Sequence, residues 1–190
     1  SMSLLLGKHD FRVPYSMVAS LAVYRALESL ARYDRPGVAS GLRLKWVNDV
    51  LYHGKKVAGI LTEEREGRAV IGIGVNLNCS RLPREISAAA TSVLIERGCR
   101  VDPVSFAAGL LNRLLPLIDR VHRGGLREVL LQWEEASAVR GRLVRVLCED
   151  GSEYRGTAEG IDPDTGALLL RDGEGKRHLI YDGSLEELFS

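Results

Sequence analysis

The sequence predicts an α+β protein in which a mixed, mainly antiparallel sheet with packed helices is followed by a small β-barrel. Two observations lead to this fold class. Residues 15–32 carry apolar side chains at a helical period, and alternating β-type runs follow over residues 42–78. Near Ser137 the pattern changes to short β-type runs separated by turn sequences such as DPDTG and DGEG. We therefore divide the chain into a sheet-and-helix domain, 1–136, and a barrel, 137–190.

Two helical regions are expected in the first domain. The first spans residues 15–32, where Pro14 suits the first turn of a helix. The second opens at Asp102 and Pro103, a typical helix start, and extends to about Glu135. Within it, Pro116 should kink or split the helix, and the Gly124-Gly125 pair should break it.

Three β-type runs lie between these helical regions. LRLKW alternates apolar and basic side chains, and VAGILTEE and AVIGIGVNLN follow it across turn sequences in YHGKK and REGR. Runs joined by short turns favour neighbouring antiparallel strands. The sequence therefore predicts an antiparallel meander.

Composition excludes several classes of protein. The 190 residues include 26 Lys+Arg and 25 Asp+Glu, a net charge of +1, so no global field attracts nucleic acid or an anionic membrane. No apolar run approaches the roughly 20 residues that span a bilayer. The three cysteines are scattered and lack metal-ligand spacing, which is typical of reduced thiols in a cytoplasmic protein.

The stretch IGIGVNLN, residues 71–78, has an unusual face. As a strand it places Ile71 and Ile73 on one side and Gly72 and Gly74 on the other, with Asn76 continuing the glycine side. Glycine weakens a strand, so two on one face indicate that another group approaches the backbone there. From the residues alone, a bulge or tight packing against a helix is about as good an explanation as a ligand groove.

Polar residues gather in the neighbouring segments KWVND and GKKVAGIL. Lys45 and Lys56 could neutralise phosphoryl oxygens, and Asp49 could hold Mg²⁺ directly or through water or phosphate. Asn48 and Asn76 could fix polar edges or metal-bound waters. Each residue alone also fits a solvated strand face or a turn. Their coincidence beside a groove favours a site for a polyphosphate and a flat ligand.

The segment LKWVNDVLYHGKKVAGILTEE followed by VIGIGVNLN resembles the catalytic domain of biotin protein ligases. Their pattern is Lys-Trp-Pro-Asn-Asp, then Lys-(apolar)-Ala-Gly-Ile-Leu, then Gly-(x)-Gly-(Ile/Val)-Asn, and Val47 stands here in place of the proline. LLQWEEAS resembles the lead-in to the family's second domain, and GTAEGIDPDTGALLLR with DGSLEEL resembles its SH3-like barrel. The resemblance covers essentially the whole chain.

The resemblance implies an enzyme that activates biotin with ATP and Mg²⁺ as biotinyl-5′-AMP and transfers it to a lysine of a biotin carboxyl carrier domain. It implies three catalytic residues, Lys56, Lys45 and Asp49, of which Asp49 is the metal-holding one. Biotin would contact Lys56, Gly59, Ile60, Leu61, Gly72 and Gly74. ATP would contact Lys45, Asn48, Asp49, Lys56 and Asn76.

The sequence also departs from the family. A Ser/Thr-rich biotin-contacting segment and a Gly/Arg-rich loop usually open the catalytic domain, and neither is found here, so we expect its N-terminal part to be missing. A catalytically incompetent ligase-like binding module is therefore an alternative, as is a relative of lipoate ligases or octanoyl transferases. No winged helix is visible, so DNA binding is not expected. A homodimer through exposed sheet edges stays open.

Overall fold

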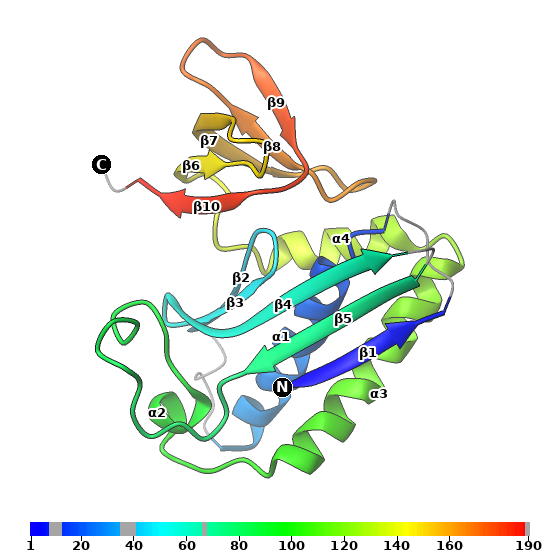
Figure 1. Ribbon diagram of the computed structural model, residues 1–190, viewed down its shortest axis with the longest axis vertical. Helices are drawn as coiled ribbons and strands as arrows, with labels where there is room; N and C mark the ends of the chain where they lie inside the picture. The colour runs from blue at the N-terminus through cyan, green and yellow to red at the C-terminus, as the bar shows by residue number, and fades with distance from the viewer. Residues whose placement is uncertain (8–12, 35–40, 66–67, 189–190) are drawn as a thin grey trace.

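The computed structural model describes residues 1–7, 13–34, 41–65 and 68–188, which form two five-stranded antiparallel sheets and four helices (Figure 1). The first sheet contains β1 (Met2–Leu6), β2 (Leu42–Lys45), β3 (Asp49–Tyr52), β4 (Lys55–Arg65) and β5 (Arg68–Val75). The helices are α1 (Tyr15–Asp34), α2 (Val93–Arg97), α3 (Pro103–His122) and α4 (Leu126–Glu135). The second sheet contains β6 (Leu143–Leu147), β7 (Glu153–Ile161), β8 (Leu168–Arg171), β9 (Arg177–Ile180) and β10 (Ser184–Glu187).

The first sheet has the strand order β1-β5-β4-β3-β2, so β2 to β5 form an antiparallel meander. The predicted pairing of neighbouring runs is confirmed for β4 and β5, but β3, which the sequence did not indicate, lies between β2 and β4. The turn between β3 and β4 is made by His53 and Gly54, both with positive φ, as tight hairpins require. The turn expected at REGR falls on residues 66–67, outside the described residues. The peptide bond between Trp46 and Val47, in the loop from β2 to β3, is cis.

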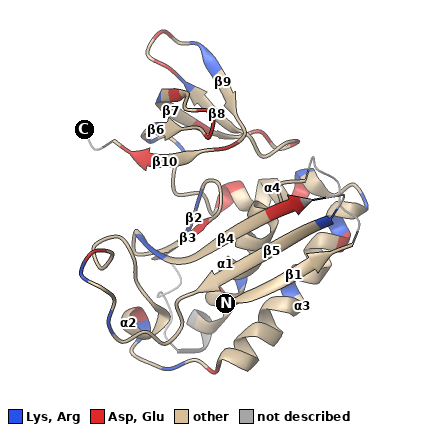
Figure 2. Ribbon diagram, viewed as in Figure 1, with Lys and Arg blue, Asp and Glu red and all other residues tan. Residues whose placement is uncertain are grey.

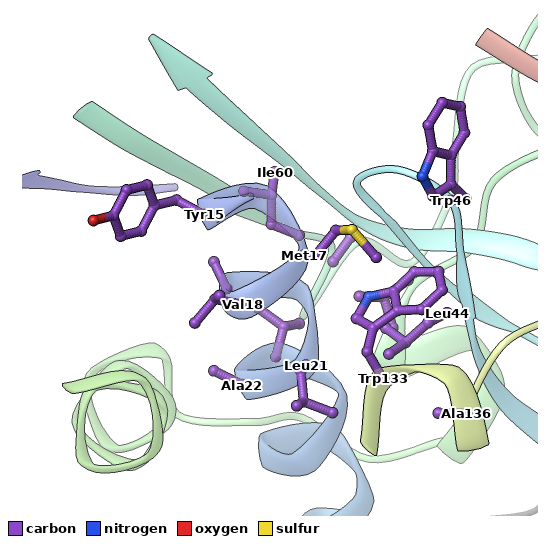
Figure 3. Close-up of a cluster of buried hydrophobic side chains, with 14 of the residues drawn as sticks. Tyr15, Met17, Val18, Leu21, Ala22, Leu44, Trp46, Ile60, Trp133 and Ala136 are labelled. Atoms are coloured by element: carbon purple, nitrogen blue, oxygen red, sulfur yellow. The ribbon is translucent and has the colours of Figure 1, made fainter. Parts of the chain in front are cut away.

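The helices cover one face of the first sheet, and α1 packs across β2 to β5 (Figure 1). Its buried side chains meet Leu44 and Ile60 from the sheet and Trp133 from α4 (Figure 3). The Trp133 indole N–H donates a hydrogen bond to Ser20 Oγ at 3.0 Å, so the core's largest side chain has no unsatisfied donor. Among the described residues, α1 and the two helices packed against it, α3 and α4, all lie on this one face of the sheet (Figure 1).

The predicted helical regions are confirmed. Helix α3 ends at His122 and α4 begins at Leu126, so the Gly124-Gly125 pair does break the helical region. Pro116, however, lies inside the continuous helix α3 and does not split it. Both Pro116 and Asn112, whose carbonyl loses its usual donor, are exposed, so water can satisfy that carbonyl.

The second sheet has the order β10-β6-β7-β8-β9 and corresponds to the expected barrel. The connection from α4 to the second sheet is bonded to β2: Leu44 N–H donates to Ala136 O and Ala138 N–H donates to Leu44 O, both at 2.8 Å. The Trp46 indole N–H donates to Gly166 O at 3.1 Å, in the turn before β8. The loop from β2 to β3 is thus held by both parts of the chain.

Two remaining expectations can be compared with the structure. None of the three cysteines, all of which lie in the described ranges, forms a disulfide. Across the described ranges, we find no helix with both the length and the apolar character required to cross a bilayer.

Candidate functional site

A pocket of about 720 Å³ lies over β4 and β5. Because Ile71 and Ile73 point into the helix-covered core, the alternate residues Gly72 and Gly74 point to the opposite face, where the pocket is. Most of the expected site residues line it: Asn48, Lys56, Gly59, Ile60, Leu61, Gly72, Gly74 and Asn76. The topology thus brings three separate sequence segments to one place.

Gly72 and Gly74 are not required by packing or by the backbone. A Cβ added at Gly72 would come no closer than 3.6 Å to Leu61 O, and one at Gly74 no closer than 3.8 Å to Gly59 O. Neither glycine has a positive φ, and the β4–β5 register is regular across both. A bulge and tight packing against a helix are therefore excluded as explanations. What the two glycines provide is an open floor for the pocket.

Lys56 and Asp49 form an ion pair at the pocket, with 2.6 Å between Lys56 Nζ and Asp49 Oδ1. The pair crosses over Gly59, because a Cβ there would lie 2.8 Å from Lys56 Cε and 2.9 Å from Nζ. Gly59 therefore has a different role from Gly72 and Gly74. It leaves room for the lysine rather than for a ligand.

Asp49 is the residue suited to a cation. Its Oδ1 is buried and accepts no hydrogen bond, so the Lys56 ammonium is its compensating contact. Among the described residues no three His, Cys, Asp or Glu side chains gather as a metal site. A single carboxylate fits Mg²⁺ that keeps several waters and takes its other ligands from phosphates.

Asn48 and Asn76 are held in place by the backbone around the pocket. Asn48 Nδ2 donates to Ile60 O at 2.9 Å, and Asn76 Nδ2 donates to Thr91 O at 3.0 Å. These bonds fix the orientation of both amides at the pocket. Asn78, two residues further on, has a structural role, since its side chain exchanges two hydrogen bonds with the backbone of Val101.

Lys45 does not line this pocket. It lies in a second groove of about 730 Å³ between β2, the segment 137–142 and β10, lined by Arg43, Lys45, Arg140, Arg142, Glu186 and Glu187 among others. Lys45 is nevertheless the direct cross-strand partner of Asp49. Its stem therefore starts beside the pocket although its side chain lines the groove.

The segment 86–90 is a wall of the pocket that the sequence pattern did not indicate. Ile86, Ala89 and Ala90 line the pocket, and Lys56 N–H donates to Ala89 O at 2.8 Å. Small apolar residues in a connection carry no local signal of a site. Only the pairing with β4 brings them there.

The charge distribution suits a ligand that is anionic at one end. Figure 2 shows basic residues at the start of β4, acidic residues at its end, and uncharged backbone between them. The pocket thus offers a cation at one end and backbone groups along its floor. Such an arrangement can hold a flat, partly apolar molecule and neutralise charge that develops beside it.

Two protein-family models match the sequence. Residues 1–79 match the "Biotin/lipoate A/B protein ligase family", and residues 141–184 match the "Biotin protein ligase C terminal domain". The biotin--[acetyl-CoA-carboxylase] ligase of Paracoccus denitrificans is 37% identical over 175 residues, covering 85% of this chain and 68% of that protein. The bifunctional ligase/repressor BirA of Bacillus subtilis is 33% identical over 182 residues, covering 90% of this chain.

Solved structures show the same likeness. The biotin protein ligase of Aquifex aeolicus in complex with biotin and ATP superposes with a TM-score of 0.86 at 28% identity, covering 98% of this chain and 77% of that one. The chain spans about half the length of the first relatives it matches, 52% of the Bacillus subtilis protein and 43% of the Escherichia coli BirA.

Proposed function

Because this chain belongs to the biotin protein ligase family, we propose that it attaches biotin to a lysine of a biotin carboxyl carrier domain, using ATP and passing through biotinyl-5′-AMP. The observation that carries the proposal is the meeting of a glycine-cleared floor, Gly72 and Gly74, with the Lys56 ammonium in one pocket. The open floor leaves room for a flat ring system against the backbone, and the lysine lies where it could bind the carboxylate of the same ligand.

In the proposed complex the biotin rings lie along Gly72 and Gly74, with the backbone of Gly59, Ile60 and Leu61 as a second wall. Ile60 suits this backbone role because its side chain is buried in the core (Figure 3). Backbone N–H and C=O groups can pair with polar ring atoms without occupying the pocket. The biotin carboxylate then points towards Lys56.

Lys56 acts by charge in both proposed steps. In the first, a biotin carboxylate oxygen attacks the α-phosphorus of ATP, the bond to pyrophosphate breaks, and the mixed anhydride forms. In the second, a carrier lysine amine attacks the anhydride carbonyl and AMP leaves. Negative charge grows on the α-phosphoryl oxygens in the first step and on the carbonyl oxygen in the second. A fixed ammonium stabilises both transition states.

The nucleotide end of the site is assigned to Asp49, Asn48, Asn76 and Lys45. Asp49, with its buried Oδ1, would hold Mg²⁺ directly or through water, which lowers the charge repulsion of the triphosphate. Asn48 and Asn76 would bind polar edges of ATP or metal-bound waters. Lys45, opposite Asp49 on β2, would approach the triphosphate from the neighbouring groove.

Mass spectrometry of a mixture of the chain, biotin, Mg-ATP and an apo carrier domain tests the proposal. We expect biotinyl-5′-AMP to form and the carrier to gain one biotin, and we expect Lys56→Ala to lose both products. Lipoate added in excess should not compete, because the backbone N–H and C=O groups along the floor can pair with the ureido ring of biotin and find no such polar atoms on the dithiolane ring of lipoate. Binding of biotin or ATP without either product would contradict the enzyme and leave a binding module.

The proposed reaction also implies where the protein works. ATP and the carboxylase carrier domain are its co-substrates, and none of its three cysteines forms a disulfide. Cysteines without disulfides are the usual state in a reducing compartment. We therefore propose a cytoplasmic location.

A further inference from the structure

The pocket wall, segment 86–90, and the next residue, Thr91, are hydrogen-bonded to the backbone of Lys56. Lys56 N–H donates to Ala89 O at 2.8 Å, and Thr91 N–H donates to Lys56 O at 2.9 Å, so both peptide groups of Lys56 are used. This short parallel pairing, centred on Lys56 and Ala90, lies outside the regular sheet. Any movement of the wall therefore acts directly on the lysine that the proposed chemistry needs.

Contacts between the side chains of Thr91, Glu96 and His53, outside the pocket, hold this wall in place. Thr91 Oγ–H donates to Glu96 Oε1 at 2.5 Å, and the other carboxylate oxygen, Oε2, is 2.7 Å from His53 Nδ1. Thr91 is 2% exposed, so its hydroxyl has little access to water as a replacement. Glu96 belongs to α2, whereas His53 belongs to the turn that leads into β4. The carboxylate thus joins the two segments that flank Lys56.

The Glu96 carboxylate is less exposed than the carboxylates of the surface ion pairs. The Glu96 side chain is 15% exposed although its partner His53 is 54% exposed, whereas in ion pairs such as Arg120–Glu128 both side chains are more than half exposed. Burial raises the pKa of Tyr52, and the nearby carboxylate of Glu96 and the thiol of Cys99 raise it further. Neither the Thr91 hydroxyl nor Glu96 lines the pocket.

We propose that Glu96 is a positioning residue: by bridging Thr91 and His53 it holds the 89–91 wall against the backbone of Lys56 and so fixes the lysine for adenylation. The inference rests on the proposed function for its catalytic consequence only. Its structural part, the attachment of the wall through Glu96, can be tested without any reaction.

The decisive comparison is Glu96→Ala against Glu96→Gln. Glutamine keeps an oxygen for the Thr91 hydroxyl and offers an amide to His53, whereas alanine leaves the buried hydroxyl without its acceptor. We expect Glu96→Ala to lower kcat for biotinyl-5′-AMP formation about tenfold or more, the effect of leaving one buried hydroxyl without a hydrogen-bond partner. Glu96→Gln should keep kcat within about twofold, and the KM for biotin should change less than about threefold in both, because Gly72 and Gly74 are untouched.

Thr91 and Glu128 supply the controls. Thr91→Val removes the hydroxyl at nearly constant volume and should lower kcat as Glu96→Ala does, and the double variant should be no slower than the slower single one. Glu128→Ala removes an exposed pair with Arg120 far from the pocket lining and should leave kcat unchanged. An equal loss in Glu128→Ala or in Glu96→Gln would overturn the proposal.

Hydrogen exchange tests the attachment independently of activity. In Glu96→Ala the amides of Lys56 and Thr91 should exchange about tenfold faster, while those that pair β4 with β5 keep their protection. Unchanged exchange at both amides would refute the attachment. A wild-type chain that forms no biotinyl-5′-AMP would refute the proposed function instead, and the exchange result would still decide the role of Glu96.

Discussion

The two sheets have the same number of antiparallel strands but differ in their exposed faces, one of which is open where the other is covered by side chains. On the first sheet, the strands facing the pocket carry Gly72 and Gly74, with open space where side chains would be. On the second, the exposed face is filled by an ion-pair network in which Glu153 joins Arg145 and Arg155 at 2.8 and 2.6 Å, and Glu159 joins Arg171 and Arg177 at 2.5 and 2.7 Å.

The exposed face of the second sheet is covered by its own side chains, whereas the pocket face of the first sheet is not. The charged side chains of the second sheet pair with one another and occupy its face, so little space is left there for a ligand. A strand face without side chains gives up packing and conformational stability, and only an outside group can use the space. Glycines on the two sheets should consequently respond to substitution in opposite ways.

The largest effect is expected at the cation of the first sheet. Lys56→Ala should lower the rate of biotinyl-5′-AMP formation about a hundredfold or more, because a preorganised group that stabilises developing charge typically contributes about 3 to 4 kcal/mol. The variant should also lose stability, because the buried Asp49 Oδ1 loses the ammonium that compensates its charge. Single-turnover kinetics on the folded fraction would measure the loss of rate. Arg155→Ala, in the network of the second sheet, is the matched control and should retain the full rate.

The next effect concerns the cleared floor. Gly72→Ala should fold normally, because the added Cβ meets no atom within 3.5 Å, but should raise the KM for biotin about tenfold or more by occupying the ligand's space. Steady-state kinetics at varied biotin, with a thermal unfolding curve on the same sample, would measure both quantities. An unchanged KM in a folded variant would show that the floor is not the binding surface.

Gly156 on β7 should behave in the opposite way. A Cβ there would lie 2.1 Å from Arg171 O, so Gly156→Ala requires the backbone of β8 to move. We expect a loss of about 1 to 3 kcal/mol in the free energy of unfolding, typical of overpacking. Urea unfolding would measure it. The KM for biotin of the fraction that stays folded should be that of the wild type.

A smaller, pH-dependent effect is expected at the junction of the two sheets. Burial raises the pKa of Glu134, although Arg140 and the N–H of Ile161 favour its charged form. A raised pKa means that the protonated form stabilises the fold, fully below the ordinary value of 4.5, and that this contribution is lost as pH rises through the folded pKa. Glu134→Gln keeps an acceptor for Ile161 and should remove that loss. Unfolding curves at pH 4 and pH 7 would show this as a smaller difference in the free energy of unfolding between the two pH values in Glu134→Gln than in the unaltered chain.

The smallest effect has the opposite sign and lies on the exposed network. Hydrogen bonds from Arg145 and Arg155 lower the pKa of Glu153 to about 2, from an ordinary value of 4.5. Its contribution is therefore present above pH 4.5 and is lost as pH falls through about 2. Glu153→Gln should make unfolding less sensitive to acid in this range. Thermal unfolding between pH 5 and pH 2 is the measurement, and salt should weaken the effect.

The sequence indicates the elements whose patterns are long. Helix α1 and the strands β4 and β5 have enough residues for their periods to be visible, and the Gly124-Gly125 break is a local signal. Strand β3 was not indicated, because its residues after Asp49 are all buried and show no alternation. Helix α2 has five residues and depends on the Ser92 cap and its neighbours rather than on a period.

The candidate site was predictable where one segment carries an anomaly and not where distant segments meet. The paired glycines and the lysines of KWVND and GKKVAGIL could be recognised in the sequence, but the different surroundings of the glycines could not. Only the structure distinguishes Gly59, which makes room for Lys56, from Gly72 and Gly74, which face open space. The wall at 86–91, the Glu96 bridge and the position of Lys45 in another groove depend on tertiary pairing.

A crystal structure of the chain with biotin and ATP would test the central claim most directly. We predict that the biotin rings lie over Gly72 and Gly74, with the carboxylate, or the phosphate of the adenylate, within hydrogen-bonding distance of Lys56 Nζ. Biotin bound instead in the groove that Lys45 lines, or between α1 and α3, with the glycine floor empty, would contradict it.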